Sequence, residues 1–169
     1  MSILSALGKA VKAFADDMST PESFKKGEDF ENYVRENLFI GKYYDLLERT
    51  HDYQTNKDYV KSSLKPDFKF RDRLTKREFY VEVKYRNGIL SADNKLIWCN
   101  DKQLARYLEY DKQTSVFILL GIGGTPKYPE YVSLIPLAQA KYTGLFPSVV
   151  ERYGIDPEKP IPSKILWSK

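Results

Sequence analysis

The residues best suited to chemistry lie in two segments where apolar and charged side chains alternate. From Phe79 to Arg86, the strand period of two places the apolar side chains on one face and Glu82 and Lys84 on the other. The preceding alternating segment places Asp67 on its own charged face. If these two strands pair, Asp67 lies beside Glu82. Two carboxylates and a lysine are therefore expected to share one surface.

This grouping predicts metal-assisted hydrolysis of phosphodiester bonds. Mg²⁺ prefers hard oxygen ligands and leaves positions for water and a substrate phosphate. Asp67, Glu82 and the carbonyl of Val83 are the expected inner ligands, and Mn²⁺ is expected to substitute. Lys84 is placed to orient the attacking water and to offset charge that develops on the phosphate. His51 is the only histidine, and it is interpreted as a loop residue and not as a catalytic base.

The elements that must position these residues follow from hydrophobic periodicity and turn signals. Strands are predicted near 43–49, 66–72, 78–86, 114–121 and 130–136, and helices over 3–17, about 20–39, 101–112 and 147–153. The helix over 101–112 allows the strand that follows it to return parallel to 78–86. Residues 121–129 are predicted to form a loop. The tail over 157–162 is expected to be extended, with Trp167 as an anchor.

The same residues carry a resemblance to a known family. Pro66-Asp67 followed by Glu82-Val83-Lys84 resembles the signature of the PD-(D/E)xK nucleases, which belong to the restriction-endonuclease-like superfamily. The motif layout, which covers about residues 25–120, is most similar to archaeal-type Holliday junction resolvases.

The resemblance implies two further site residues on helices. In these relatives a glutamate that follows a Lys-Gly pair on the first helix completes the acidic site. Glu31 matches that position, with Glu28 as the alternative. A glutamine on the helix after the Glu-x-Lys strand contacts the site in the family, and Gln103 matches it.

The resemblance also implies a fold and an activity. The fold is α/β, with a restriction-endonuclease-like mixed central sheet flanked by helices in the order αβββαβ. We expect a single nuclease-like domain over 1–169, with its core at about 20–136, an N-terminal amphipathic helix at 3–17 and a C-terminal extension at 137–169. The expected activity is that of a Mg²⁺-dependent DNA endonuclease, with Holliday junction resolution as a structure-selective form. RNA is an alternative substrate, and a homodimer is one expectation because many relatives are dimeric.

Two other interpretations remain open. The charged strand faces are also compatible with solvated cross-strand ion pairs. Alternatively, the chain is a non-catalytic nucleic-acid-binding or scaffold subunit of a DNA-processing or defence complex. Basic residues that surround the site would serve either kind of nucleic-acid binding; they are Lys61, Lys65, Lys69, Arg71, Arg73, Lys76, Arg77 and Arg86.

Composition narrows the remaining classes. The 169 residues are 42% hydrophobic, enough for one sizeable core, and the net charge of +4 suits nucleic acid as a partner. Cys99 is the only cysteine, which excludes an internal disulfide and a zinc site built from cysteines. The longest uncharged stretch, 113–126, is shorter than the roughly 18 apolar residues of a membrane span. With no secretory signal pattern, a cytoplasmic protein without membrane partners is expected.

Overall fold

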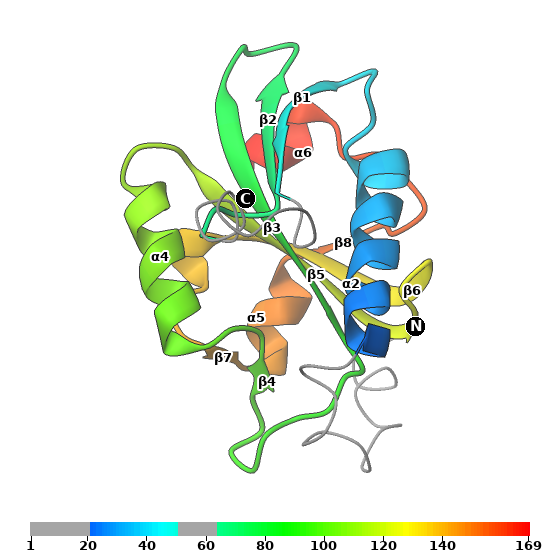
Figure 1. Ribbon diagram of the computed structural model, residues 1–169, viewed down its shortest axis with the longest axis vertical. Helices are drawn as coiled ribbons and strands as arrows, with labels where there is room; N and C mark the ends of the chain where they lie inside the picture. The colour runs from blue at the N-terminus through cyan, green and yellow to red at the C-terminus, as the bar shows by residue number, and fades with distance from the viewer. Residues whose placement is uncertain (1–20, 51–63) are drawn as a thin grey trace.

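The computed structural model describes residues 21–50 and 64–169 as a mixed α/β arrangement around a central sheet (Figure 1). The amphipathic helix predicted at 3–17 lies outside the described residues. The helical segments are α2 (Pro21–Tyr33), the π-helical turn η1 (Val34–Leu38), α4 (Asp101–Asp111), the 3₁₀ turn η2 (Leu137–Gln139), α5 (Pro147–Arg152) and α6 (Ser163–Trp167). The strands are β1 (Tyr44–Arg49), β2 (Phe68–Asp72), β3 (Glu78–Arg86), β4 (Leu96–Ile97), β5 (Val116–Thr125), β6 (Tyr128–Pro136), β7 (Gly144–Leu145) and β8 (Gly154–Ile155).

The main sheet of the described part has the strand order β1-β2-β3-β5-β6-β8. β3 and β5 are parallel, whereas the other neighbours pair antiparallel. The predicted parallel return of the strand after 101–112 is therefore confirmed, with α4 in the crossover connection. β4 and β7 form a separate small sheet, which gives order to part of the long connection between β3 and α4.

The two faces of the sheet are covered by different helices. Phe79, Val81 and Val83 of β3 point into a core that also contains side chains of α2 and α6. Tyr80 points into the opposite core, where side chains of α4 and α5 pack. This alternation places the Tyr80, Glu82 and Lys84 face of β3 on the α4 side of the sheet.

The loop predicted over 121–129 is wrong, because β5 continues to Thr125 and β6 begins at Tyr128. The glycines serve packing and hairpin geometry. A Cβ on Gly121 would lie 2.4 Å from the Phe30 ring, so only glycine allows α2 to approach β5 this closely. Gly124, near the turn, has a φ of +64°.

The helix predicted over 20–39 is present, but its last turn is π-helical. Phe30, Val34 and Leu38 of this segment are fully buried, whereas Phe24 is 43% exposed. The prediction of an extended tail over 157–162 is wrong for 157–159, which form a turn in which the N–H of Lys159 donates to the carbonyl of Asp156. The short helix α6 that follows was not predicted by the sequence analysis. Trp167 anchors this helix as predicted, because its indole donates a hydrogen bond to Asp72. Among the described residues, every helix is too short or too polar to cross a bilayer.

Candidate active site

The site lies at a fork in the sheet, where β3 continues past the first residue of its antiparallel neighbour β2. The register between β2 and β3 begins at Phe68 opposite Val81, so β2 provides no partner for the following residues of β3. Asp67, just before β2, occupies this gap, and its Oδ2 accepts a hydrogen bond of 2.7 Å from the N–H of Val83. Because the N–H and C=O of one strand residue point to the same side, the Val83 carbonyl also faces the fork.

Glu82 is the buried acid of the site, with only 2% of its surface exposed. Its Oε1 lies 2.6 Å from the Nζ of Lys84 and accepts a hydrogen bond of 2.6 Å from the hydroxyl of Tyr107. The ring of Tyr107 stacks on Trp98 at 5.9 Å between centroids, which fixes the hydroxyl. The other oxygen, Oε2, is buried and has no hydrogen-bond partner in the described structure.

The charges at the fork perturb one another. Burial raises the pKa of Asp67, and the nearby carboxylates of Glu82 and Glu31 raise it further, to well above its usual range, against the opposing effects of Lys84 and the Val83 N–H. Burial would lower the pKa of Lys84, but Glu82 and Asp67 outweigh it and raise this pKa. The lysine therefore stays protonated beside an acidic cluster that strongly favours a cation.

Glu31 approaches the fork from α2. Its Oε2 lies 3.4 Å from an Nη of Arg49 on β1, and the same guanidinium donates to Asn32 at 2.8 Å. The charge of Glu31 acts on Asp67, whereas Glu28, one turn earlier, is exposed. The sequence analysis gave Glu31 and Glu28 as alternative acids of the first helix. Of the two, Glu31 is the one that lies near Asp67. The sequence analysis missed Arg49, which no motif singled out.

Gln103 stands at the start of α4, where it completes the helix cap. Its Oε1 accepts from the N–H of Asn100 at 3.0 Å, while the Asn100 side chain accepts from the N–H of Gln103. The α4 residue that contacts Glu82 is Tyr107, one turn further along. The sequence analysis missed it, although the spacing of four residues places both on one face of the helix.

Most of the basic residues that the sequence analysis placed around the site form hydrogen bonds or ion pairs with other residues of the fold. The Arg86 guanidinium is partly buried and donates to the carbonyls of Tyr85, Ile97 and Trp98, which ties the β3 to α4 connection to the end of β3. Partly exposed ion pairs do lie along β1, β2 and β3, as the solvated-face interpretation expects; they are Lys65–Glu48, Lys69–Glu78, Arg71–Glu78 and Arg73–Asp45. Lys61 lies outside the described residues.

The oxygen atoms at the fork fit a divalent cation that keeps several water ligands. Within residues 21–50 and 64–169, no group of three or more His, Cys, Asp or Glu side chains is arranged to hold a metal. Mg²⁺ is commonly bound through only one or two carboxylates, with water in the other positions. Asp67, Glu82 with its unpaired Oε2, and the Val83 carbonyl match that smaller set.

Comparisons with protein-family models, with curated proteins and with solved structures found no match to this chain.

Proposed function

We propose that this protein is a metal-dependent nuclease that hydrolyses phosphodiester bonds in DNA, on a restriction-endonuclease-like core. The observation that carries the proposal is the meeting of Asp67, Glu82 and Lys84 at the fork, with one buried oxygen of Glu82 left without a partner. An unsatisfied buried carboxylate oxygen costs stability in a fold and is explained when a ligand completes it.

The residues of the fork divide into ligands and positioning groups. Asp67, Glu82 and the Val83 carbonyl would hold Mg²⁺ or Mn²⁺, which when bound supplies Lewis acidity toward phosphoryl oxygens and acidifies a water molecule. The Val83 N–H fixes the carboxylate of Asp67, and the hydroxyl of Tyr107 fixes that of Glu82. These contacts leave Asp67 Oδ1 and Glu82 Oε2 for the cation.

Lys84 is the cationic group of the proposed site. It is held 2.6 Å from Glu82, and its raised pKa keeps it charged at neutral pH. In this position the ammonium can orient an attacking water and balance negative charge on the phosphate. Removal of one donor that stabilises transition-state charge typically lowers the rate about 10²–10³-fold. Glu31, held by Arg49, adds a negative charge at the border of the site.

The sequence supports DNA as the substrate through its resemblance to junction resolvases and its net charge of +4. We favour a structure-selective endonuclease, with resolution of Holliday junctions as one form of it. A homodimer would bring two such sites to two strands.

The test uses the full chain with branched, linear and single-stranded DNA, each with Mg²⁺, Mn²⁺ or EDTA. We expect metal-dependent cleavage that Asp67→Asn and Glu82→Gln abolish and that Lys84→Met lowers about 100-fold or more. Lys127→Met, at the exposed β5 to β6 turn, is the matched control and should cleave like the wild type. Wild-type rates in Lys84→Met would refute the assignment. Salt-sensitive binding without cleavage would instead identify the non-catalytic alternative.

A further inference from the structure

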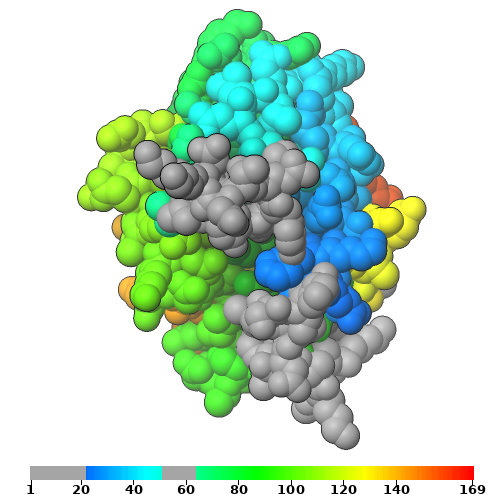
Figure 2. Space-filling view, viewed as in Figure 1, coloured from blue at the N-terminus to red at the C-terminus, as the bar shows by residue number. Residues whose placement is uncertain are grey.

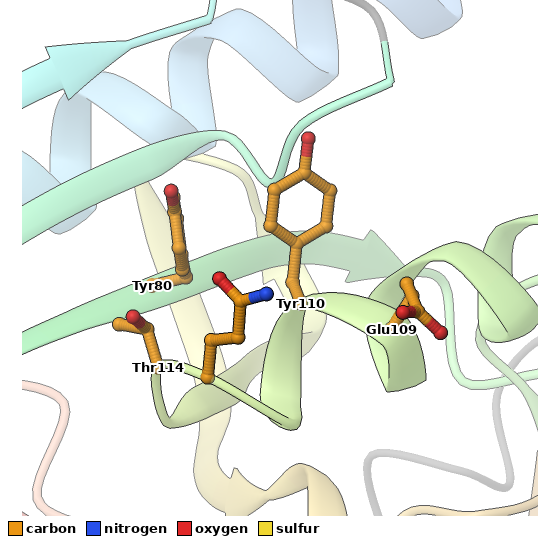
Figure 3. Close-up of a pocket in the computed structure, with 5 residues that line it drawn as sticks. Tyr80, Glu109, Tyr110 and Thr114 are labelled. Carbon is orange, nitrogen blue, oxygen red and sulfur yellow. The ribbon is translucent and has the colours of Figure 1, made fainter.

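A small hollow lies between β3 and α4, next to the proposed site but separate from it. Figure 3 shows the side chains that line it. Its volume is about 190 Å³. That is below the ~300–1,000 Å³ of sites for drug-sized ligands, so it suits one planar ring system. We call it the tyrosine pocket; its residues are Tyr80, Glu109, Tyr110, Gln113 and Thr114.

The position of the tyrosine pocket follows from the strand and helix that also build the site. Tyr80 precedes Glu82 by two residues on the same face of β3, a distance of roughly 7 Å along the strand. On α4, Tyr107 contacts Glu82, and Tyr110 contacts Tyr80 one turn later, at 5.2 Å between ring centroids. The pocket and the site are therefore neighbours along the same interface between β3 and α4.

The side chains of the tyrosine pocket have the chemistry of a base-binding surface. Tyr80 and Tyr110 stand next to each other at 63° with their hydroxyls on the same side, and Tyr110 is only half-buried (Figure 3). Because Tyr80 is only 9% exposed, the accessible ring is that of Tyr110, and bases stack on such a ring whatever their sequence. Gln113 is exposed at the pocket and offers an amide, and Thr114 offers a hydroxyl, both able to bond a base edge.

Two lysines supply positive charge to the same place. The Nζ of Lys69 lies 5.6 Å from the centroid of the Tyr80 ring, and Lys65 is near enough to Tyr80 and Tyr110 for both tyrosines to contribute to its raised pKa, after the larger effect of its hydrogen bond to Glu48. Their partners, Glu78 and Glu48, are partly exposed, so these ion pairs can exchange with a phosphate at little cost.

We propose that the tyrosine pocket binds one unpaired nucleobase of the strand whose phosphate lies at the Asp67 and Glu82 site. This inference rests on the proposed function and adds a substrate class to it. A base can enter the pocket only after it leaves the stack of a duplex, which is least costly at a branch, a mismatch or a single-stranded end. The pocket therefore selects DNA with an unpaired base near the cut over continuous duplex.

The test measures binding without cleavage, on the full chain in EDTA. Forked duplexes fix the register of the DNA, and one abasic residue is moved through successive positions beside the junction. We expect one position at which loss of the base weakens binding about tenfold, as measured by fluorescence anisotropy. Tyr110→Leu keeps the bulk of the side chain but removes its aromatic face. In this variant the abasic residue should no longer weaken binding; we call the loss of affinity caused by the abasic residue the abasic penalty. Tyr128→Leu, at an 80% exposed tyrosine that begins β6, should still lose affinity at that abasic position.

A second variant and a second probe avoid dependence on the folding of Tyr110→Leu. Gln113→Ala, at an exposed position, should reduce the abasic penalty without changing thermal unfolding. In the wild type, 2-aminopurine at the sensitive position should change its fluorescence on binding, as expected for a base that leaves the stack.

The outcomes separate the two proposals. Equal affinity at every abasic position, or a penalty unchanged in both variants, overturns the tyrosine pocket even when the same forks are cut with Mg²⁺. A penalty that both variants reduce supports the pocket even when no fork is cut, and the nuclease proposal then fails alone. Absence of DNA binding overturns both.

Discussion

Glu82 shows at the scale of a single residue how folding and the proposed function conflict. One of its oxygens is satisfied by Lys84 and Tyr107, while the other is buried without a partner. A group in this state costs about 1–3 kcal/mol, which a fold selected for stability alone would avoid. Under the proposed function, this loss of stability is the cost of an oxygen that is kept open for a metal ion.

Asp67→Asn should stabilise the protein in the absence of metal. The raised pKa of Asp67, caused by burial and then by Glu82 and Glu31, means that its ionised form destabilises the fold at neutral pH. The amide removes the charge and can still accept the Val83 N–H. We expect a melting temperature about 2–4 °C higher, equivalent to ~1 kcal/mol in a domain of this size, measured in EDTA. A matched Asp45→Asn change, at an exposed ion pair, should not raise it.

Tyr107→Phe should destabilise the protein and slow cleavage. The change removes the donor to Glu82 but keeps the ring on Trp98, so the effect isolates one hydrogen bond to a charged group. Such bonds contribute about 1.5–3 kcal/mol, to be measured by denaturant unfolding. Tyr128→Phe, at an exposed tyrosine, controls for hydroxyl loss in general. Equal stability of the two variants would show that the bond to Glu82 contributes nothing.

The sequence predicted the meeting of Asp67, Glu82 and Lys84 because strand alternation and antiparallel pairing are local rules. It could not predict Tyr107 or Arg49. Their contacts depend on the rotation of α4 about its axis and on how β1 lies against α2, which are set by packing between distant segments. The placement of side chains along one strand pair is thus predictable from sequence, while their contacts with side chains of distant elements are not.

At the scale of elements, the placement of α2 depends on a glycine in β5. The ring of Phe30 lies where a side chain on Gly121 would be, and Phe30 directly precedes Glu31. This contact brings the helix close enough to the sheet for Glu31 to act on Asp67.

Gly121→Ala should therefore push α2 away from the sheet. Overpacking of a core typically costs ~1–3 kcal/mol, which denaturant unfolding would measure. Phe30→Leu in the same chain should recover part of the loss, because the smaller side chain leaves room for the new methyl group. Purely additive effects of the two substitutions would contradict a direct clash.

Element prediction succeeded where local signals and packing agree. The alternation of 78–86 correctly predicted β3, and α4 begins where the sequence predicted a helix over 101–112. It failed over 121–129, because glycines favour turns locally whereas here close packing of Phe30 and a buried central strand require them. The coarse α/β arrangement was therefore predictable, and the β5 to β6 hairpin was not.

At the scale of the whole molecule, the buried carboxylate of Asp72 links the C-terminal helix α6 to the β2 to β3 hairpin by hydrogen bonds. Asp72 is 1% exposed and accepts hydrogen bonds from Ser163 and Trp167 of α6, and from Thr75 and the N–H of Leu74 in the hairpin. The indole of Trp167 also packs under Arg77, 3.6 Å from the guanidinium carbon.

Because these hydrogen bonds favour the ionised carboxylate of Asp72, the free energy of unfolding should depend on pH in the acid range. Burial of Asp72 would raise its pKa, but the hydrogen bonds from Ser163, Trp167, Thr75 and Leu74 outweigh it and lower the pKa to about 2. Because the pKa in the unfolded chain is ~3.9, the stabilisation is fully present above that pH and is lost as the pH falls through about 2.

Asp72→Asn should therefore lose about 2–3 kcal/mol of unfolding free energy at pH 7, with the difference from wild type shrinking between about pH 4 and pH 2. Urea unfolding of both proteins across this range measures it, and Asp45→Asn, an exposed acid on the neighbouring strand, should lose less than about 1 kcal/mol. Stability curves for Asp72→Asn and wild type that stay parallel down to pH 2 would show that the ionised carboxylate does not hold α6.

The fork at Asp67 lies at the opposite end of β2 from Asp72, so cleavage by Asp72→Asn at neutral pH should persist while the chain stays folded.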